Sequence, residues 1–302
     1  MRISTTLNTL NPDESAGGYS AFAAVNKLCD AGFQALDIPF FKYASVDLDY
    51  GATPFFSDQW AQWAEKLGTL AADRQIIFNQ SHNLTFNFFD PDEKTALLNA
   101  CVDRAILINE MLGIKNTVLH PIAPRGYEYD SRKSKECNTA YFRRKAEFAA
   151  DHGVNILLEN MLSNRKFDGQ IVKRYCDNPY ELAELVEAIN MPNVQICFDV
   201  GHAHYMSGDV CADLMVVKDH VQGLHIHDND RWNDEHLLPF QGTIPWEKLC
   251  RTLAGIHYAG DFTLEIALCI SRMPKEIQHK ALLSAYETAE YLVSRINAAN
   301  LA

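Results

Sequence analysis

The sequence predicts an α/β fold, a (β/α)8 TIM barrel built as one domain over residues 1–302. Eight short apolar segments alternate with eight amphipathic segments along the chain, and a small residue or a turn separates each pair. Eight strands alternating with eight helices over about 300 residues is the pattern of this barrel. No linker rich in Pro, Gly or Ser interrupts the alternation, which favours a single domain.

The expected strands are nearly continuously apolar, as is typical of parallel strands covered on both faces. They lie within residues 2–6, 30–38, 76–82, 112–120, 151–159, 191–199, 221–228 and 258–266. The expected helices lie at 18–31, 57–73, 92–112, 134–152, 179–190, 209–219, 245–256 and 275–298. Gly32, Gly113 and Gly153 stand where three helices need a left-handed C-cap. A doubly wound open sheet is the alternative, but no GxGxxG or GxxxxGK[ST] motif follows any strand.

Composition limits the functional classes. The net charge is −12, which argues against a nucleic-acid partner because binding to phosphates draws on a surplus of Lys and Arg. Eight cysteines without a CxxC pair predict reduced thiols and no thiolate zinc site. The first residues lack the apolar core of a signal peptide, and no apolar run is long enough for a membrane span. These features predict a cytoplasmic protein.

Acids and imidazoles end seven of the eight expected strands. In chain order they are Asp37, His82, His120, Glu159, Asp199 with His202 just beyond, His225 with His227, and Glu265. A lone member of this set is usually a helix cap or a hydrogen-bonded imidazole. Because the carboxyl ends of all strands meet at one mouth of the barrel, their recurrence predicts a metal site there.

The expected ligand set combines two Glu, one Asp and one imidazole. Such mixed oxygen and nitrogen donors suit one divalent ion, Mn²⁺ first, with Co²⁺, Mg²⁺ and Zn²⁺ as competitors. His225 and His227 alternate on one strand, and one of them is expected to lie beside the site instead of binding the ion.

Five segments resemble the xylose-isomerase-like barrel superfamily, which includes sugar-phosphate isomerases, ketose 3-epimerases, inosose dehydratase and endonuclease IV. They are LLENM (157–161), CFDVGHA (197–203), GLHIHDND (223–230), DEHLLPFQGTIPW (234–246) and TLEIA (263–267). The resemblance implies a metal held by Glu159, Asp199, His225 and Glu265, with His225 matching the H-x-x-D pattern. It also implies that Glu159 and Glu265 act as catalytic base and acid.

Similarity to the ketose epimerases implies that His202 and Arg231 bind substrate, with His82, His120 and His227 as further substrate contacts. Those enzymes carry a second Glu six residues after the first metal ligand, where this chain has Arg165. The function implied is a divalent-metal-dependent isomerase or epimerase of a sugar, sugar phosphate or keto-polyol, acting through a metal-stabilised enediolate. A carbohydrate-like substrate and a homo-oligomer are expected.

Two alternatives remain open. An inosose-dehydratase-type lyase would use the same site. An endonuclease IV-like phosphodiesterase would bind three zinc ions, and Asp234 and His236 would supply the additional ligands with His82, His120 and His202.

Overall fold

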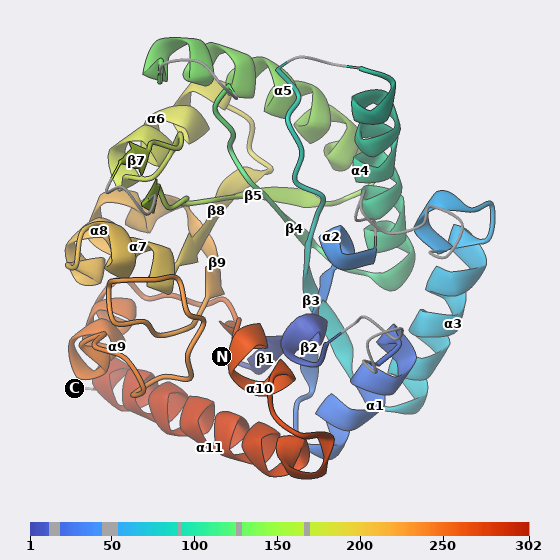
Figure 1. The fold of residues 1–302 in the computed structure, drawn as a ribbon, viewed down its shortest axis with the longest axis vertical. Coiled ribbons are helices and arrows are strands. Elements are labelled where there is room, and N and C mark those ends of the chain that lie inside the picture. The colour runs from blue at the N-terminus through green and yellow to red at the C-terminus, as the bar shows by residue number, and fades with distance from the viewer. Residues whose placement is uncertain (12–18, 44–53, 90–91, 125–128, 166–169, 302) are drawn as a thin grey trace.

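A ring of helices surrounds a central parallel sheet in the computed structural model, which describes residues 1–11, 19–43, 54–89, 92–124, 129–165 and 170–301 (Figure 1). The sheet strands are β1 (Ile3–Thr6), β2 (Ala35–Pro39), β3 (Ile77–His82), β4 (Asn116–Leu119), β5 (Asn155–Glu159), β8 (Val194–Asp199), β9 (Val221–His225) and β10 (Phe262–Leu264). Their order is β10-β1-β2-β3-β4-β5-β8-β9, and every pairing is parallel. A parallel bridge between Ile226 and Leu264 links the two edge strands. The predicted barrel is therefore confirmed.

All eight predicted helices are present. They are α1 (Ala21–Asp30), α3 (Trp60–Asp73), α4 (Glu93–Leu112), α5 (Ser131–Asp151), α6 (Pro179–Ile189), α8 (Val210–Val217), α9 (Trp246–Gly255) and α11 (Lys275–Asn300). Short elements that the sequence pattern did not indicate lie in the connections: α2 (Phe40–Tyr43), α7 (Val200–Met206), α10 (Ala267–Ser271), and the hairpin of β6 (Asn164–Arg165) and β7 (Ile171–Val172). They were missed because elements this short show no usable periodicity.

Local signals explain where several helices begin and end. The Asp92 side chain accepts a hydrogen bond from Thr95 N at the start of α4, and Gly113 ends that helix with φ of 71°. Asn178 caps α6, whose first residue is Pro179. The sequence-predicted stop at Gly113 is thus a left-handed C-cap.

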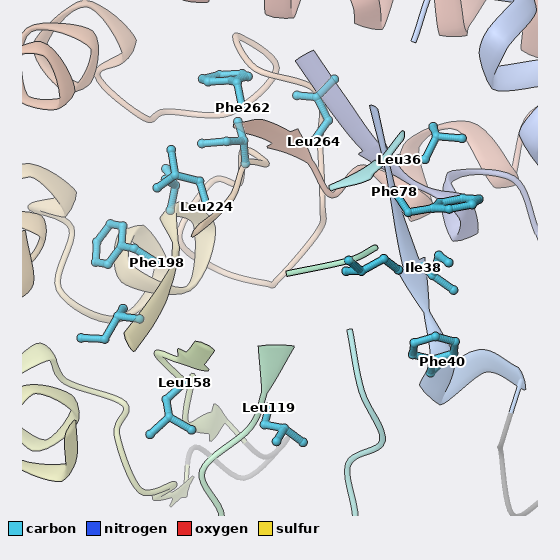
Figure 2. Packing of buried hydrophobic residues seen from close by; sticks show 14 of the residues in the cluster. Leu36, Ile38, Phe40, Phe78, Leu119, Leu158, Phe198, Leu224, Phe262 and Leu264 are labelled. Atoms are coloured by element: carbon cyan, nitrogen blue, oxygen red, sulfur yellow. The ribbon is translucent and has the colours of Figure 1, made fainter. Parts of the chain in front are cut away.

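Side chains alternate between the two faces of each strand, and this alternation positions the polar residues at the mouth. In β5, Ile156 and Leu158 belong to the large cluster that includes the helices, whereas Leu157 joins Val118 and Cys197 in a small separate cluster. Figure 2 shows Leu158, Phe198, Leu224 and Leu264 among the residues of the large cluster. The intervening positions face the barrel axis, so the last inward residues of β5 and β8 are Glu159 and Asp199.

All eight cysteines are free thiols, as predicted from their spacing. Within the described ranges, no helix combines the length and apolarity that crossing a membrane requires.

Candidate metal centre

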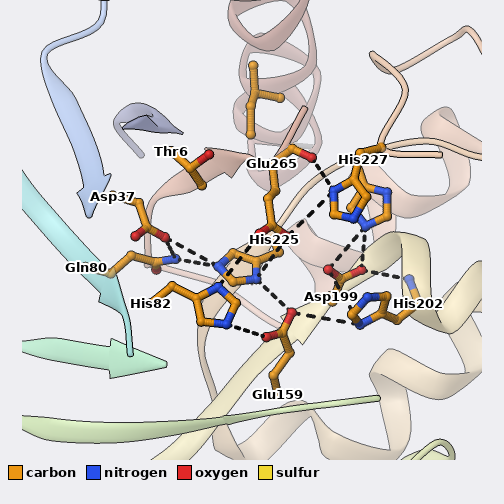
Figure 3. A network of polar contacts seen from close by, with 12 residues as sticks. Thr6, Asp37, Gln80, His82, Glu159, Asp199, His202, His225, His227 and Glu265 are labelled. Atoms are coloured by element: carbon orange, nitrogen blue, oxygen red, sulfur yellow. Dashed lines mark hydrogen bonds and ion pairs between the residues drawn. The ribbon is translucent and has the colours of Figure 1, made fainter. Parts of the chain in front are cut away.

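Four side chains from neighbouring strand ends meet at the carboxyl end of the barrel: Glu159, Asp199, His225 and Glu265, here called the quartet (Figure 3). Each offers a donor atom that lies within 4.8 Å of the other three. The first three are fully buried, and Glu265 is 6 % exposed. The sequence-predicted ligand set is thus brought together by the fold, and its role in binding a metal stays a prediction.

Histidines surround the carboxylates of the quartet. His225 Nδ1 lies 2.8 Å from Glu159 Oε1 and 3.5 Å from Glu265 Oε2. On its other side, Glu159 Oε2 lies 2.7 Å from His120 Nε2. Within the described part of the chain, every ion-pair partner of the three quartet carboxylates is a histidine.

This arrangement changes the proton affinities of the quartet. Burial raises the pKa of the Glu159 carboxyl, but His225 and His120 outweigh it and hold that pKa well below its usual range. Glu265 behaves likewise, with the charge of His225 and the nearby His82, whose Nδ1 lies 3.7 Å from Glu265 Oε1, holding its pKa low. Burial lowers the pKa of His225, whereas Cys197, Glu265 and Glu159 raise it to a net value well above normal. Without a metal these shifts favour ionised carboxylates at Glu159 and Glu265 beside a protonated imidazole at His225.

A second group of possible ligands, His202, His227, Asp234 and His236, lies beside the quartet, again with donor atoms within 4.8 Å. His202 Nδ1 is 2.8 Å from the backbone oxygen of Asn160, and His236 Nδ1 is 2.7 Å from that of Glu265. In both contacts Nδ1 must carry the proton, because only a protonated nitrogen can donate to a carbonyl. The Nε2 atoms of both imidazoles face Asp234 instead, at 3.6 and 3.1 Å from its Oδ2. That orientation is typical of metal-ligating histidines. A hydrogen bond to Asp234 and the negative charges of Glu265 and Asp234 raise the pKa of His236 to about 9 despite its burial.

The predicted substrate contacts occupy different places. His82 and His120 lie against Glu159, with their Nε2 atoms 2.7 Å apart, and His227 Nε2 is 3.0 Å from Asp199 Oδ1. Arg231 is exposed and does not reach the quartet: its Nη2 lies 3.4 Å from Ser207 O at the end of α7. The Arg165 side chain falls outside the described part of the structure.

Two residues that support the site were not predicted. Asn160 joins β5 to β8, because its side chain accepts from Asp199 N at 2.7 Å and donates to Asp199 O at 2.8 Å. Asp228 is fully buried and accepts from Phe240 N, Ile244 N and Trp246 Nε1, which fixes the loop after β9 that carries Asp234 and His236. The H-x-x-D pattern at 225–228 contains Asp228, but from the sequence alone that pattern indicated only that His225 is a ligand.

The residues present fit a divalent cation. Three buried carboxylates close together repel one another and need compensating positive charge. Protonated His225 supplies part of that charge in the metal-free protein, and a divalent ion would take the place of its proton. Three carboxylate oxygens with one imidazole nitrogen suit Mn²⁺, Co²⁺, Mg²⁺ or Zn²⁺.

Gly201 lets His227 lie beside Asp199. A Cβ at Gly201 would lie 1.9 Å from His227 Cε1. We expect Gly201→Ala to displace the imidazole and lower the free energy of unfolding by about 1–3 kcal/mol, through overpacking. Gly255→Ala in α9 is the matched control, since nothing lies within 4 Å of its added Cβ, and it should stabilise by about 0.4–1 kcal/mol. Urea denaturation measures both, and equal effects of the two variants would contradict the close packing.

Comparisons with known proteins agree with the barrel fold. An uncharacterized protein of Methanocaldococcus jannaschii is 32 % identical over 121 residues, which span 39 % of this chain and 39 % of that protein. The solved structure of a D-tagatose 3-epimerase-like protein has a TM-score of 0.74 at 21 % identity and covers 98 % of both chains. D-psicose 3-epimerase from Clostridium cellulolyticum H10 has a TM-score of 0.73 at 16 % identity, covering 97 % of this chain and 99 % of the other.

At these identities the two structures are evidence for a shared fold alone. The pattern of the xylose isomerase-like TIM barrel family matches residues 25–281, which is most of the chain. The chain belongs to the xylose isomerase-like TIM barrel family.

Proposed function

We propose that the protein is a divalent-metal-dependent isomerase or epimerase acting on a sugar, a sugar phosphate or a related keto-polyol. The observation that carries the proposal is the quartet: three buried carboxylates and one imidazole at the mouth, with histidines as the ion-pair partners of those carboxylates in the described ranges. The epimerases that share the fold support the same substrate class.

Glu159, Asp199, His225 and Glu265 would hold the ion. A bound divalent ion polarises a carbonyl and stabilises the negative charge that develops on its oxygen. Glu159, kept ionised by its histidine neighbours, would remove the proton from the carbon between a hydroxyl and a carbonyl of the substrate. The product of that step is an enediolate.

Glu265, after taking up a proton from solvent, would return a proton to this intermediate, and Glu159 would release to solvent the proton that it removed. Return to the opposite face of the same carbon inverts it, and return to the neighbouring carbon moves the carbonyl. Expulsion of a β-hydroxyl from the same intermediate would instead make the protein a dehydratase. His202 would hold a substrate oxygen, with His82, His120 and His227 as further contacts. Arg231 would have to turn from Ser207 toward the mouth to contact the substrate.

A cavity beside His120 supports a small-molecule substrate. It has a volume of about 530 Å³, within the range typical of small-molecule sites. Its wall combines apolar side chains, among them Phe86, Ile122 and Met161, with the polar groups of Asn87 and Asn164. Such a mixture suits the CH faces and hydroxyls of a carbohydrate.

The second ligand group favours one other function, an endonuclease IV-like phosphodiesterase with three zinc ions. His82, His120 and Glu159 form a third possible ligand set, which shares Glu159 with the quartet. The quartet, this third set and the group around Asp234 could then hold one ion each, which makes three ions at the mouth. The net charge of −12 weighs against duplex DNA as the substrate.

Metal stoichiometry separates the two functions. After loading with excess Mn²⁺ or Zn²⁺ and dialysis, elemental analysis should find one ion per chain, and His236→Gln should leave that number unchanged. His152→Gln, which alters an imidazole paired with Glu110 away from the mouth, is the matched control. Three zinc ions in the wild type, fewer in His236→Gln, and cleavage of an abasic-site duplex would favour the phosphodiesterase.

A further inference from the structure

Asp37, the acid that ends β2, lies behind the quartet. It is fully buried, and its Oδ2 accepts a hydrogen bond from Gln80 Nε2 at 2.9 Å. The same Gln80 nitrogen lies 3.0 Å from His225 Nε2, which is itself 3.5 Å from Asp37 Oδ2 (Figure 3). Two buried polar side chains, one from β2 and one from β3, thus converge on the far side of the ring of His225, which ends β9.

The near side of that ring faces the quartet. His225 Nδ1 points at Glu159 Oε1 and Glu265 Oε2, so Nδ1 is the nitrogen that could bind a cation. A neutral imidazole carries one proton and one free lone pair. A cation on Nδ1 therefore requires the proton to be on Nε2, directed at Asp37 and Gln80.

Asp37 can accept that proton's hydrogen bond, whereas the Gln80 nitrogen cannot. The amide nitrogen is a donor and would oppose an Nε2–H group. Rotating the amide would bring its oxygen to His225 but would set that oxygen against the Asp37 carboxylate. Asp37 also has spare capacity, because its buried Oδ1 has no hydrogen-bond partner in the described structure. A buried carboxylate with an unused acceptor is costly for folding, which makes a purely structural role a poor explanation.

We propose that Asp37 is a positioning residue that keeps a proton on His225 Nε2, so that Nδ1 is the nitrogen that gives up its proton and turns its lone pair to a metal ion, while Gln80 orients the Asp37 carboxylate. The inference rests on the metal centre proposed above. It adds a carboxylate–histidine–metal relay that runs from β2 through β9 to the mouth.

The test compares metal affinity with the stability of the metal-free protein. Asp37→Asn keeps the side-chain size but removes the charged acceptor, so the Mn²⁺ dissociation constant, measured by calorimetry on the full chain, should rise about 10–100-fold. The melting temperature of the metal-free variant should stay the same or rise, because a buried carboxylate is removed. If Asp37 had a merely structural role, Asp37→Asn would weaken Mn²⁺ binding and lower the melting temperature of the metal-free protein together.

Two further variants control the comparison. Gln80→Met keeps the bulk of the side chain without its hydrogen bonds and should weaken Mn²⁺ binding by a smaller factor, which also tests the relay if Asp37→Asn folds poorly. Thr117→Val removes a buried hydroxyl that bonds Ser81 and Asn83 outside the relay, and it should leave Mn²⁺ binding unchanged. In the Zn²⁺-loaded wild type, ¹⁵N NMR should find the His225 proton on Nε2.

Unchanged Mn²⁺ affinity in Asp37→Asn, or a proton on Nδ1 of His225, would overturn the relay while leaving the metal centre in place. A wild-type protein that binds no divalent ion would overturn both.

Discussion

Replacing Glu159 with Gln is expected to lower turnover about 10²–10⁴-fold without unfolding the protein, because an amide cannot take up the substrate proton. Gln keeps the shape of the side chain, and its amide can still meet His120 and His225, which lie 2.7 and 2.8 Å from the Glu159 oxygens. The rate is measured on whichever sugar the wild type converts, at saturating metal, and thermal melting reports the fold.

Two variants sharpen that result. Glu110→Gln alters an exposed carboxylate paired with His152 at 2.8 Å on the outside of the barrel, and it should leave the rate unchanged. If Glu265 returns the proton, Glu265→Gln should lose epimerisation yet still exchange the proton that Glu159 removes with solvent. A Glu159→Gln protein as active as the wild type would exclude Glu159 from the chemistry.

Asp199→Asn should separate the two roles of Asp199, as a helix cap and as a metal ligand. The Asp199 Oδ1 atom accepts a hydrogen bond from His202 N at 2.7 Å and so caps α7. Asn caps helices about as well as Asp, so the free energy of unfolding of the metal-free variant should lie within about 0.5 kcal/mol of the wild-type value. Substituting a residue that only supports a metal ligand typically weakens binding about 10–100-fold. Loss of the charged ligand Asp199 should weaken Mn²⁺ binding by a larger factor.

Asp209→Asn is the matched control for that variant. Asp209 caps α8 through Ala212 N at 3.3 Å, and it pairs with Lys248 at the surface instead of the quartet. It should change neither Mn²⁺ binding nor turnover. Mn²⁺ binding that is equally tight in Asp199→Asn and the wild type would leave Asp199 as a helix cap alone.

The sequence was sufficient to predict the strand ends that meet at the mouth. Inward and outward residues alternate along a strand, and parallel strands end at the same edge, so Glu159 and Asp199 had to approach each other once the barrel was assigned. The same reasoning applies to His225, which is in register with Asp199. Strand ends and the register of neighbouring strands are local or short-range properties. They can be predicted from where each run of apolar residues begins and ends.

Interactions across the barrel could not be predicted in this way. Gln80 and His225 are 145 residues apart, and their contact depends on how far each side chain extends into a shared interior. The direction of Arg231 depends on its own left-handed backbone, with φ of 72°, and on the contact of its guanidinium with Gly208. A Cβ at Gly208 would lie 2.3 Å from Arg231 Cζ, a restriction that appears only when the loop after β9 packs on α7.

The most direct test of the proposed function is proton exchange between substrate and solvent. Metal-loaded protein is incubated with a panel of ketoses, polyols and keto acids in deuterated water, and NMR follows deuterium at the carbon next to the carbonyl. We predict incorporation into at least one sugar, lost in Glu159→Gln and after chelation of the metal. No incorporation into any sugar by a protein that cleaves an abasic-site duplex with three bound zinc ions would contradict the isomerase or epimerase function.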